Sequence, residues 1–98
     1  MKNFVTVITR FPLPAGVTSD QVRTAFDEVA PKFRNVPGLV RKQFLQSTDG
    51  RTAGGVYLWS DEAAARAFML ERVAPMIWAK FQVKPVIEVF DSPLIVEN

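Results

Sequence analysis

The sequence contains no histidine and no cysteine, and these two absences exclude several kinds of chemistry. Without cysteine there is no disulfide, no thiol nucleophile and no thiolate metal ligand. Without histidine there is no imidazole base, no Ser-His pair and no imidazole ligand for a haem. A metal would need oxygen ligands, and no cluster of carboxylates along the chain suggests them. We therefore expect neither a metal nor a haem ligated by histidine or cysteine.

Long hydrophobic runs are also missing. No apolar stretch approaches the roughly 20 residues of a membrane span, and the run at Phe4-Val5 is too short for a signal peptide. We therefore expect a cytoplasmic protein that does not enter a membrane. The net charge is only +2 and no basic stripe appears, so a nucleic-acid partner is not expected either.

Aromatic residues are abundant. The 98 residues include eight Phe and two Trp, and 48% of the chain is hydrophobic. This length fits a single domain over residues 1–98. Its aromatic content exceeds the need of one small core, which indicates a second buried surface such as a subunit interface or a ligand cavity.

The apolar spacing predicts four strands and two helical regions. A capping box at Thr18 and Gln21 starts a helix that should end near Phe33. Ser60 should cap a second helix that Pro75 breaks, with a short helix after it. Asp49-Gly50 marks a tight hairpin. The strands are expected at residues 4–11, 39–47, 52–59 and 86–91.

This order of elements is that of the α+β, ferredoxin-like βαββαβ sandwich with an antiparallel sheet. Right-handed crossovers place the first and third strands at the centre, with both helices on one face. The uniformly apolar positions should face the helices: Val5, Val7, Val56, Leu58, Ile87 and Val89. The opposite, open face should then carry Thr6, Ile8, Arg10, Gly55, Tyr57, Trp59, Glu88 and Phe90. Such a face favours a partner subunit or a flat ligand, and the apolar tail 94–96 is suited to reach a second subunit.

Several segments together resemble one family. These are Val36-Pro37-Gly38-Leu39 with Lys42 and Phe44, the Asp49-Gly50 turn, Ala53-Gly54-Gly55-Val56-Tyr57-Leu58-Trp59, and Phe90-Asp91-Ser92-Pro93. They are similar to the YdhR-type monooxygenases of the dimeric α/β-barrel superfamily, which includes antibiotic-biosynthesis monooxygenases. The resemblance covers most of the chain.

The resemblance implies a homodimer in which two sheets pack face to face. It places a cavity either between sheet and helices or inside the barrel. It also implies cofactor-free oxidation of a small aromatic, phenolic or polyketide-like substrate, in which the deprotonated substrate itself reduces oxygen. Where family members often carry a histidine, this chain has Phe81-Gln82-Val83. A histidine-dependent proton transfer is therefore excluded, and haem-degrading relatives are poor guides.

Arg10, Tyr57 and Glu88 are the candidate catalytic residues. Arg10 could hold a phenolate, although it could instead simply pair with Glu88. Tyr57 could donate to a substrate oxygen, the alternative being barrel packing. Glu88 stands in an otherwise apolar strand and, if buried, could act as a general base; an ion pair with a neighbouring arginine is the commoner outcome.

Lys42, Gly55, Trp59 and Phe90 are the candidate substrate-binding residues. Lys42 matches a family position, but an edge-strand lysine can also serve to discourage aggregation. Trp59 could stack on a ring or pack in the core. Gly55 leaves room for a ligand or a partner strand, and Phe90 belongs to the expected open face.

Three functions fit these residues. The first is the monooxygenase described above, and the second is a dimer that binds or senses a small hydrophobic ligand without chemistry. The third is an RNA-recognition module, which has the same element order and places stacking aromatics on its third strand. Tyr57 and Trp59 alternate in that way, but the nearly balanced charge disfavours the third function.

Overall fold

A computed structural model describes residues 3–98 of the chain. The strands are β1 (Phe4–Pro12), β2 (Leu39–Gln46), β3 (Thr52–Trp59) and β4 (Val86–Ser92). The helices are α1 (Ser19–Val29), the 3₁₀ turn η1 (Ala30–Phe33), α2 (Glu62–Phe68), the π-turn η2 (Met69–Val73) and α3 (Ala74–Phe81). The predicted elements are all present, with ends that differ by one or two residues.

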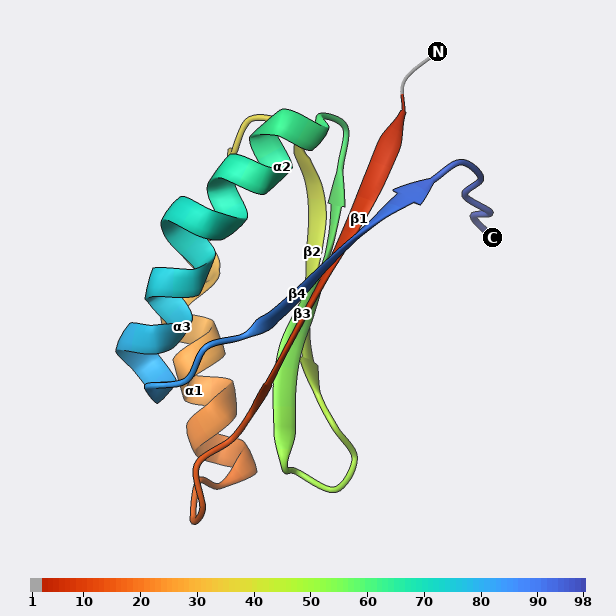
Figure 1. The fold of residues 1–98 in the computed structure, drawn as a ribbon. Coiled ribbons are helices and arrows are strands. Elements are labelled where there is room, and N and C mark those ends of the chain that lie inside the picture. Colours follow the sequence, from red (N-terminus) through yellow and green to blue (C-terminus); the bar gives the residue numbers. More distant parts are fainter. Residues whose placement is uncertain (1–2) are drawn as a thin grey trace.

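The four strands form one antiparallel sheet in the order β2-β3-β1-β4. All the helices lie on one face of this sheet, and the C-terminal tail leaves on the other side (Figure 1). The predicted ferredoxin-like α+β fold is therefore confirmed, with β1 and β3 at the centre. Within residues 3–98, none of the helices has the length and apolar character needed to cross a membrane.

The start of α1 follows the predicted capping box. The Thr18 hydroxyl accepts a hydrogen bond from the Gln21 backbone N–H at 3.1 Å, and the Gln21 side chain accepts one from the Thr18 N–H at 2.9 Å. The helix changes to the 3₁₀ turn η1 at Pro31, because proline has no N–H to donate to the preceding α-helical turn. This tighter turn carries Phe33 to the centre of the sheet.

The second helical region differs from the prediction in two ways. Asp61, not Ser60, is the N-cap, since its carboxylate accepts from the Ala64 N–H at 3.1 Å while Ser60 bonds to the Gly38 carbonyl. Pro75 does not break the helix, because the π-turn η2 changes the hydrogen-bonding pattern immediately before it. Helices α2 and α3 therefore continue one another as a single long rod (Figure 1).

The predicted faces of β3 are wrong. Val7 pairs with Tyr57 and Val5 with Trp59, and residues directly opposite each other in an antiparallel pair share a face. Tyr57 and Trp59 are 1% and 0% exposed beneath the helices. The residues predicted beneath the helices instead, Val56 and Leu58, lie on the open face. The larger rings occupy the space under the helices because two small valines stand opposite them.

Gly54 explains how closely the two central strands approach. A Cβ atom at this position would lie 1.9 Å from the Thr9 carbonyl oxygen, a backbone atom that cannot yield. A side chain at Gly54 would therefore force β1 and β3 apart. The glycine keeps the sheet continuous beside the site described next.

Candidate functional site

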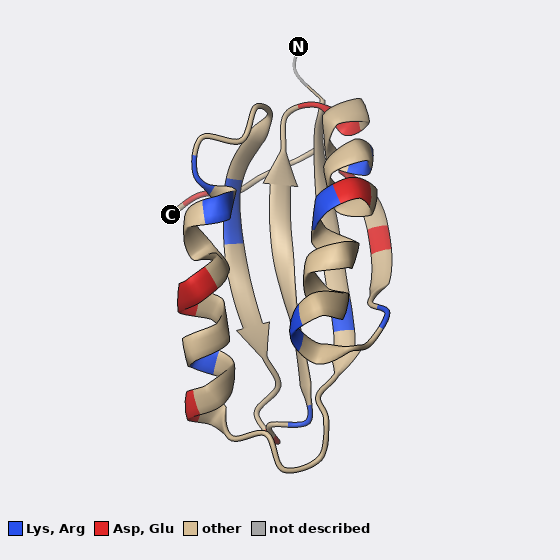
Figure 2. Ribbon diagram, turned by 90° about the vertical axis from the view of Figure 1, so that its left-hand side faces the viewer, with Lys and Arg blue, Asp and Glu red and all other residues tan. Residues whose placement is uncertain are grey.

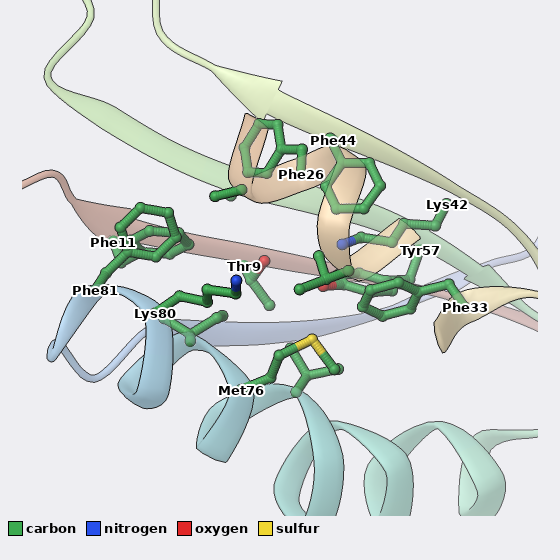
Figure 3. Close-up of a pocket in the computed structure, with 15 residues that line it drawn as sticks. Thr9, Phe11, Phe26, Phe33, Lys42, Phe44, Tyr57, Met76, Lys80 and Phe81 are labelled. Carbon is green, nitrogen blue, oxygen red and sulfur yellow. The ribbon is translucent and has the colours of Figure 1, made fainter. Parts of the chain in front are cut away.

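A cavity lies between the helical layer and the sheet, enclosed by α1, η1, η2, α3 and the first three strands (Figure 3). Its volume is about 30 Å³, room for one or two water molecules. Most of its wall is apolar, and much of it is aromatic. The side chains that define it include Phe11, Phe26, Phe33, Phe44, Tyr57, Met76, Ile77 and Phe81.

Lys42 extends from β2 into this cavity (Figure 3). Its Nζ atom lies 3.5 Å from the ring centroid of Phe44, 3.9 Å from that of Phe33 and 4.7 Å from that of Tyr57. We call these three rings the aromatic cage. A Cβ atom at Gly55 would lie 3.2 Å from the Lys42 Cε atom, so the glycine provides the room for the lysine chain.

Burial determines the charge state of Lys42. Desolvation lowers the pKa of this amine to about 7, whereas the rings of the cage stabilise the ammonium form and oppose part of that shift. No carboxylate lines the cavity among residues 3–98. The site therefore holds a primary amine whose protonation can change near neutral pH.

Two hydroxyl groups accompany the amine. Thr9 is 0% exposed and lines the cavity; its Oγ1 atom is a neighbour of the Tyr57 hydroxyl but forms no hydrogen bond of regular geometry within residues 3–98. Burial raises the pKa of the Tyr57 hydroxyl, so this group remains a neutral phenol at physiological pH. The sequence analysis missed Thr9, although it continues the alternation of Val5, Val7 and Phe11 and is the polar member of that buried series.

Three predicted site residues lie on the other face of the sheet. Arg10 and Glu88 form an ion pair of 2.6 Å, and their side chains are 58% and 39% exposed. Phe90, opposite Thr6 on the open face, is 47% exposed. The structure thus brings Arg10 and Glu88 together, as the simpler alternative for Arg10 anticipated, but separates both from Tyr57.

Trp59 lies beneath the helices without lining the cavity. It is fully buried, packs on Phe68 with ring centroids 5.6 Å apart, and its indole Nε1 has no partner among the described residues. The predicted open-face position of Trp59 is therefore wrong, and its packing agrees with the core alternative that the sequence left open. Gly55, by contrast, lies directly beneath the Lys42 chain and belongs to the site.

An ion pair links the two helices that cover the cavity. Figure 2 looks onto the helical layer, where α1 and the rod of α2 and α3 lie side by side over the sheet. The Lys80 ammonium of α3, which lines the cavity, donates to the Glu28 carboxylate of α1 at 2.5 Å. This ion pair joins the two helices, so it must adjust if they separate to admit a ligand.

The ferredoxin-like fold and the aromatic cavity under the helices place this chain in a class of small α+β proteins. Comparison with known families shows to which family within that class it belongs. The family model described as "Putative mono-oxygenase ydhR" matches residues 9–91. The chain belongs to this family, as the resemblance had indicated. A comparison with curated proteins gives no match.

Solved structures share the fold over nearly the whole chain. The protein NE2512 of unknown function from Nitrosomonas europaea has a TM-score of 0.79 at 16% identity, covering 99% of this chain and 96% of its own. The cofactor-independent oxygenase SnoaB from Streptomyces nogalater has a TM-score of 0.72 at 20% identity, covering 97% and 98%. The ActVA-Orf6 monooxygenase from Streptomyces coelicolor, solved with nanaomycin D, has a TM-score of 0.69 at 26% identity, covering 99% and 93%.

A haem-degrading protein of Mycobacterium tuberculosis also has this fold, with a TM-score of 0.72 at 20% identity, covering 95% of this chain and 99% of its own. The shared architecture therefore does not select one chemistry. Function has to be argued from the residues of the cavity.

Proposed function

We propose that this chain is a cofactor-independent monooxygenase that oxidises a small aromatic substrate with a phenolic or enolisable group in the cavity. One observation carries the proposal: within residues 3–98, an amine with no carboxylate beside it and a buried hydroxyl with no regular hydrogen bond line the same aromatic cavity. Buried polar groups are normally satisfied. A ligand oxygen placed among Lys42, Thr9 and Tyr57 would satisfy them.

Lys42, Tyr57 and Thr9 have different roles in the proposed reaction. The neutral amine of Lys42 takes the acidic proton of the substrate, and the resulting ammonium stabilises the substrate anion. The Tyr57 phenol and the Thr9 hydroxyl donate hydrogen bonds to the same anion. The anion then reduces molecular oxygen: for an anthrone-type CH₂ group, one oxygen atom becomes the new carbonyl and the other leaves as water.

The cavity must widen before it can hold such a substrate, because about 30 Å³ is far smaller than an aromatic ring. Met76 and Phe33 both line it (Figure 3), and Met76 has a flexible side chain. Movement of α3 against α1 would enlarge the site and stretch the ion pair between Lys80 and Glu28. Entry of the substrate is therefore coupled to opening of the helical layer.

A homodimer is part of the proposal. The open face of the sheet is flanked by exposed apolar side chains, among them Val86, Phe90 and Leu94. The tail residues Leu94 and Ile95 line a hollow on this face together with Thr6. Packing two such faces together would bury this surface and enclose the ion pair of Arg10 and Glu88 between the subunits. Gel filtration or sedimentation at several concentrations measures whether the dimer exists.

The decisive experiment follows oxygen uptake by the purified protein with anthrone-type and quinol-type substrates. We expect turnover that falls at least tenfold in Lys42→Met and is unchanged in Lys84→Met, which removes an exposed lysine outside the cavity. Full activity in Lys42→Met would refute the role of the amine. Tight binding without turnover across the panel would refute catalysis and favour the alternative, a dimer that binds or senses a small hydrophobic ligand.

A further inference from the structure

Lys42 lines two hollows. It lines the internal cavity together with Tyr57, and it also lines a groove on the surface between β2 and the loop after η1, where Arg34 and Arg41 lie. Phe33 and Phe44 are common to both hollows. The Lys42 residue therefore lies between the cavity and the solvent-facing groove, and its amine lies among the rings of the aromatic cage.

The surroundings of the amine favour its neutral form. The other charged or titratable groups lining the two hollows are Tyr57, Lys80, Arg34 and Arg41, and none of these, nor any other residue described there, is a carboxylate. Lys80 is already paired with Glu28. Desolvation disfavours the ammonium form of Lys42 and no carboxylate described there offsets it, whereas the aromatic cage supports that form. A lysine desolvated in this way is a known type of activated nucleophile.

We propose that Lys42 is also a nucleophile, which captures an aldehyde or a ketone bearing a flat ring as a reversible imine. The Nζ lone pair attacks the carbonyl carbon to give a carbinolamine. The carbonyl oxygen then leaves as water with the two protons of the amine, and a C=N bond joins ligand and lysine. The rings of the cage lie within 5 Å of Nζ and flank the bound ring. This activity needs no oxygen and is independent of the proposed oxidation.

The fraction of neutral amine determines the expected selectivity. At pH 7 about half of the Lys42 side chains are neutral, whereas an ordinary lysine with a pKa of about 10.4 is neutral in roughly one molecule in 2,500. The cation–π contacts of the cage reduce this advantage. We therefore expect Lys42 to react at least tenfold faster than exposed lysines such as Lys32 and Lys84.

The test uses 4-hydroxybenzaldehyde under nitrogen at pH 7, with cyanoborohydride to trap any imine, followed by intact mass and peptide mapping. The α-amino group, with an ordinary pKa of about 7.7–8.0, also reacts, and peptide mapping distinguishes its adduct. Among the lysines we expect one adduct, on Lys42, which disappears in Lys42→Arg and persists in the control Lys84→Arg. Its rate should fall below pH 6 as the amine becomes protonated. In 8 M urea, which removes the burial, the selectivity should vanish, so the comparison remains informative even if Lys42→Arg folds poorly.

Equal labelling of all lysines in the folded protein, or an unchanged adduct in Lys42→Arg, would overturn the proposal. Because oxygen is excluded, the result does not depend on the oxygenase activity. Absent labelling together with normal oxygen uptake refutes the nucleophile alone, and selective labelling without oxygen uptake refutes the oxygenase alone.

Discussion

Replacing Thr9 by valine should stabilise this protein while weakening its binding of ligands. The Thr9 side chain is 0% exposed, and its hydroxyl, although a neighbour of the Tyr57 hydroxyl, forms no hydrogen bond of regular geometry within residues 3–98. An unsatisfied buried hydroxyl costs about 1–3 kcal/mol, and valine has nearly the same shape without that hydroxyl. We therefore expect Thr9→Val to raise the free energy of unfolding by about 1–2 kcal/mol. For a domain of this size that corresponds to a Tm increase of about 4–15 °C.

A matched control lies on the other face of the same strand. The Thr6 hydroxyl is hydrogen-bonded to that of Ser92, so Thr6→Val breaks a bond and should lower the free energy of unfolding by about 0.5–1.5 kcal/mol. Both variants are measured by urea and thermal unfolding followed by circular dichroism at one protein concentration. The binding of a phenol is measured by calorimetry. Loss of stability in Thr9→Val, or equal affinity for the phenol, would show that the hydroxyl is already satisfied and has no role in the site.

Three further predictions concern the sheet and the cavity. Gly54→Ala places a Cβ atom against the backbone and should lower the unfolding free energy by about 3 kcal/mol. Gly55→Ala meets mainly side chains and should lower it by about 1 kcal/mol. Chemical denaturation measures both losses, and a larger loss for Gly55→Ala would contradict the packing. Arg10→Ala should change the unfolding free energy of a chain by less than about 1 kcal/mol, since its pair with Glu88 is exposed; a larger loss seen by the same assay at low concentration refutes this. Between about pH 7 and pH 10 the free energy of unfolding of the wild type should rise relative to that of Lys42→Met. The reason is that the Lys42 amine keeps its proton in the unfolded chain but has released it in the folded one. Parallel profiles of unfolding free energy against pH would contradict the buried position of the amine.

The fold was predictable because its signals are local. The capping box at Thr18, the turn at Asp49-Gly50 and the positions of the strands depend on residues close in sequence, and the structure confirms these three features, although not the faces predicted for β3. Whether Pro75 breaks the helix depends on tertiary structure. A π-turn accommodates the proline because the rod of α2 and α3 packs along the whole sheet, and nothing in the local sequence marks that turn.

The site was only partly predictable, because it depends on which face of each strand turns inward. Alternation separates Val56 and Leu58 from Tyr57 and Trp59, but it does not say which pair is covered. The pairing of Val7 with Tyr57 decides which pair is covered. Pairing between strands that are distant in sequence cannot be predicted from the sequence of either strand alone. Hydropathy favoured the aliphatic pair, whereas the depth of the helical layer required the larger rings.

The interpretation of Lys42 depends on which face of β2 carries its side chain. On an exposed edge strand, a lysine that avoids aggregation needs no further explanation. Here the strand turns it inward: Gly55 leaves space for its chain, three rings surround its amine, and no carboxylate described in the cavity compensates its charge. A methionine would fill the same space without the cost of desolvating an amine. A protein that places an amine and an unpartnered Thr9 hydroxyl on one cavity wall lowers its own stability, and a ligand that satisfies both groups gives that arrangement a function.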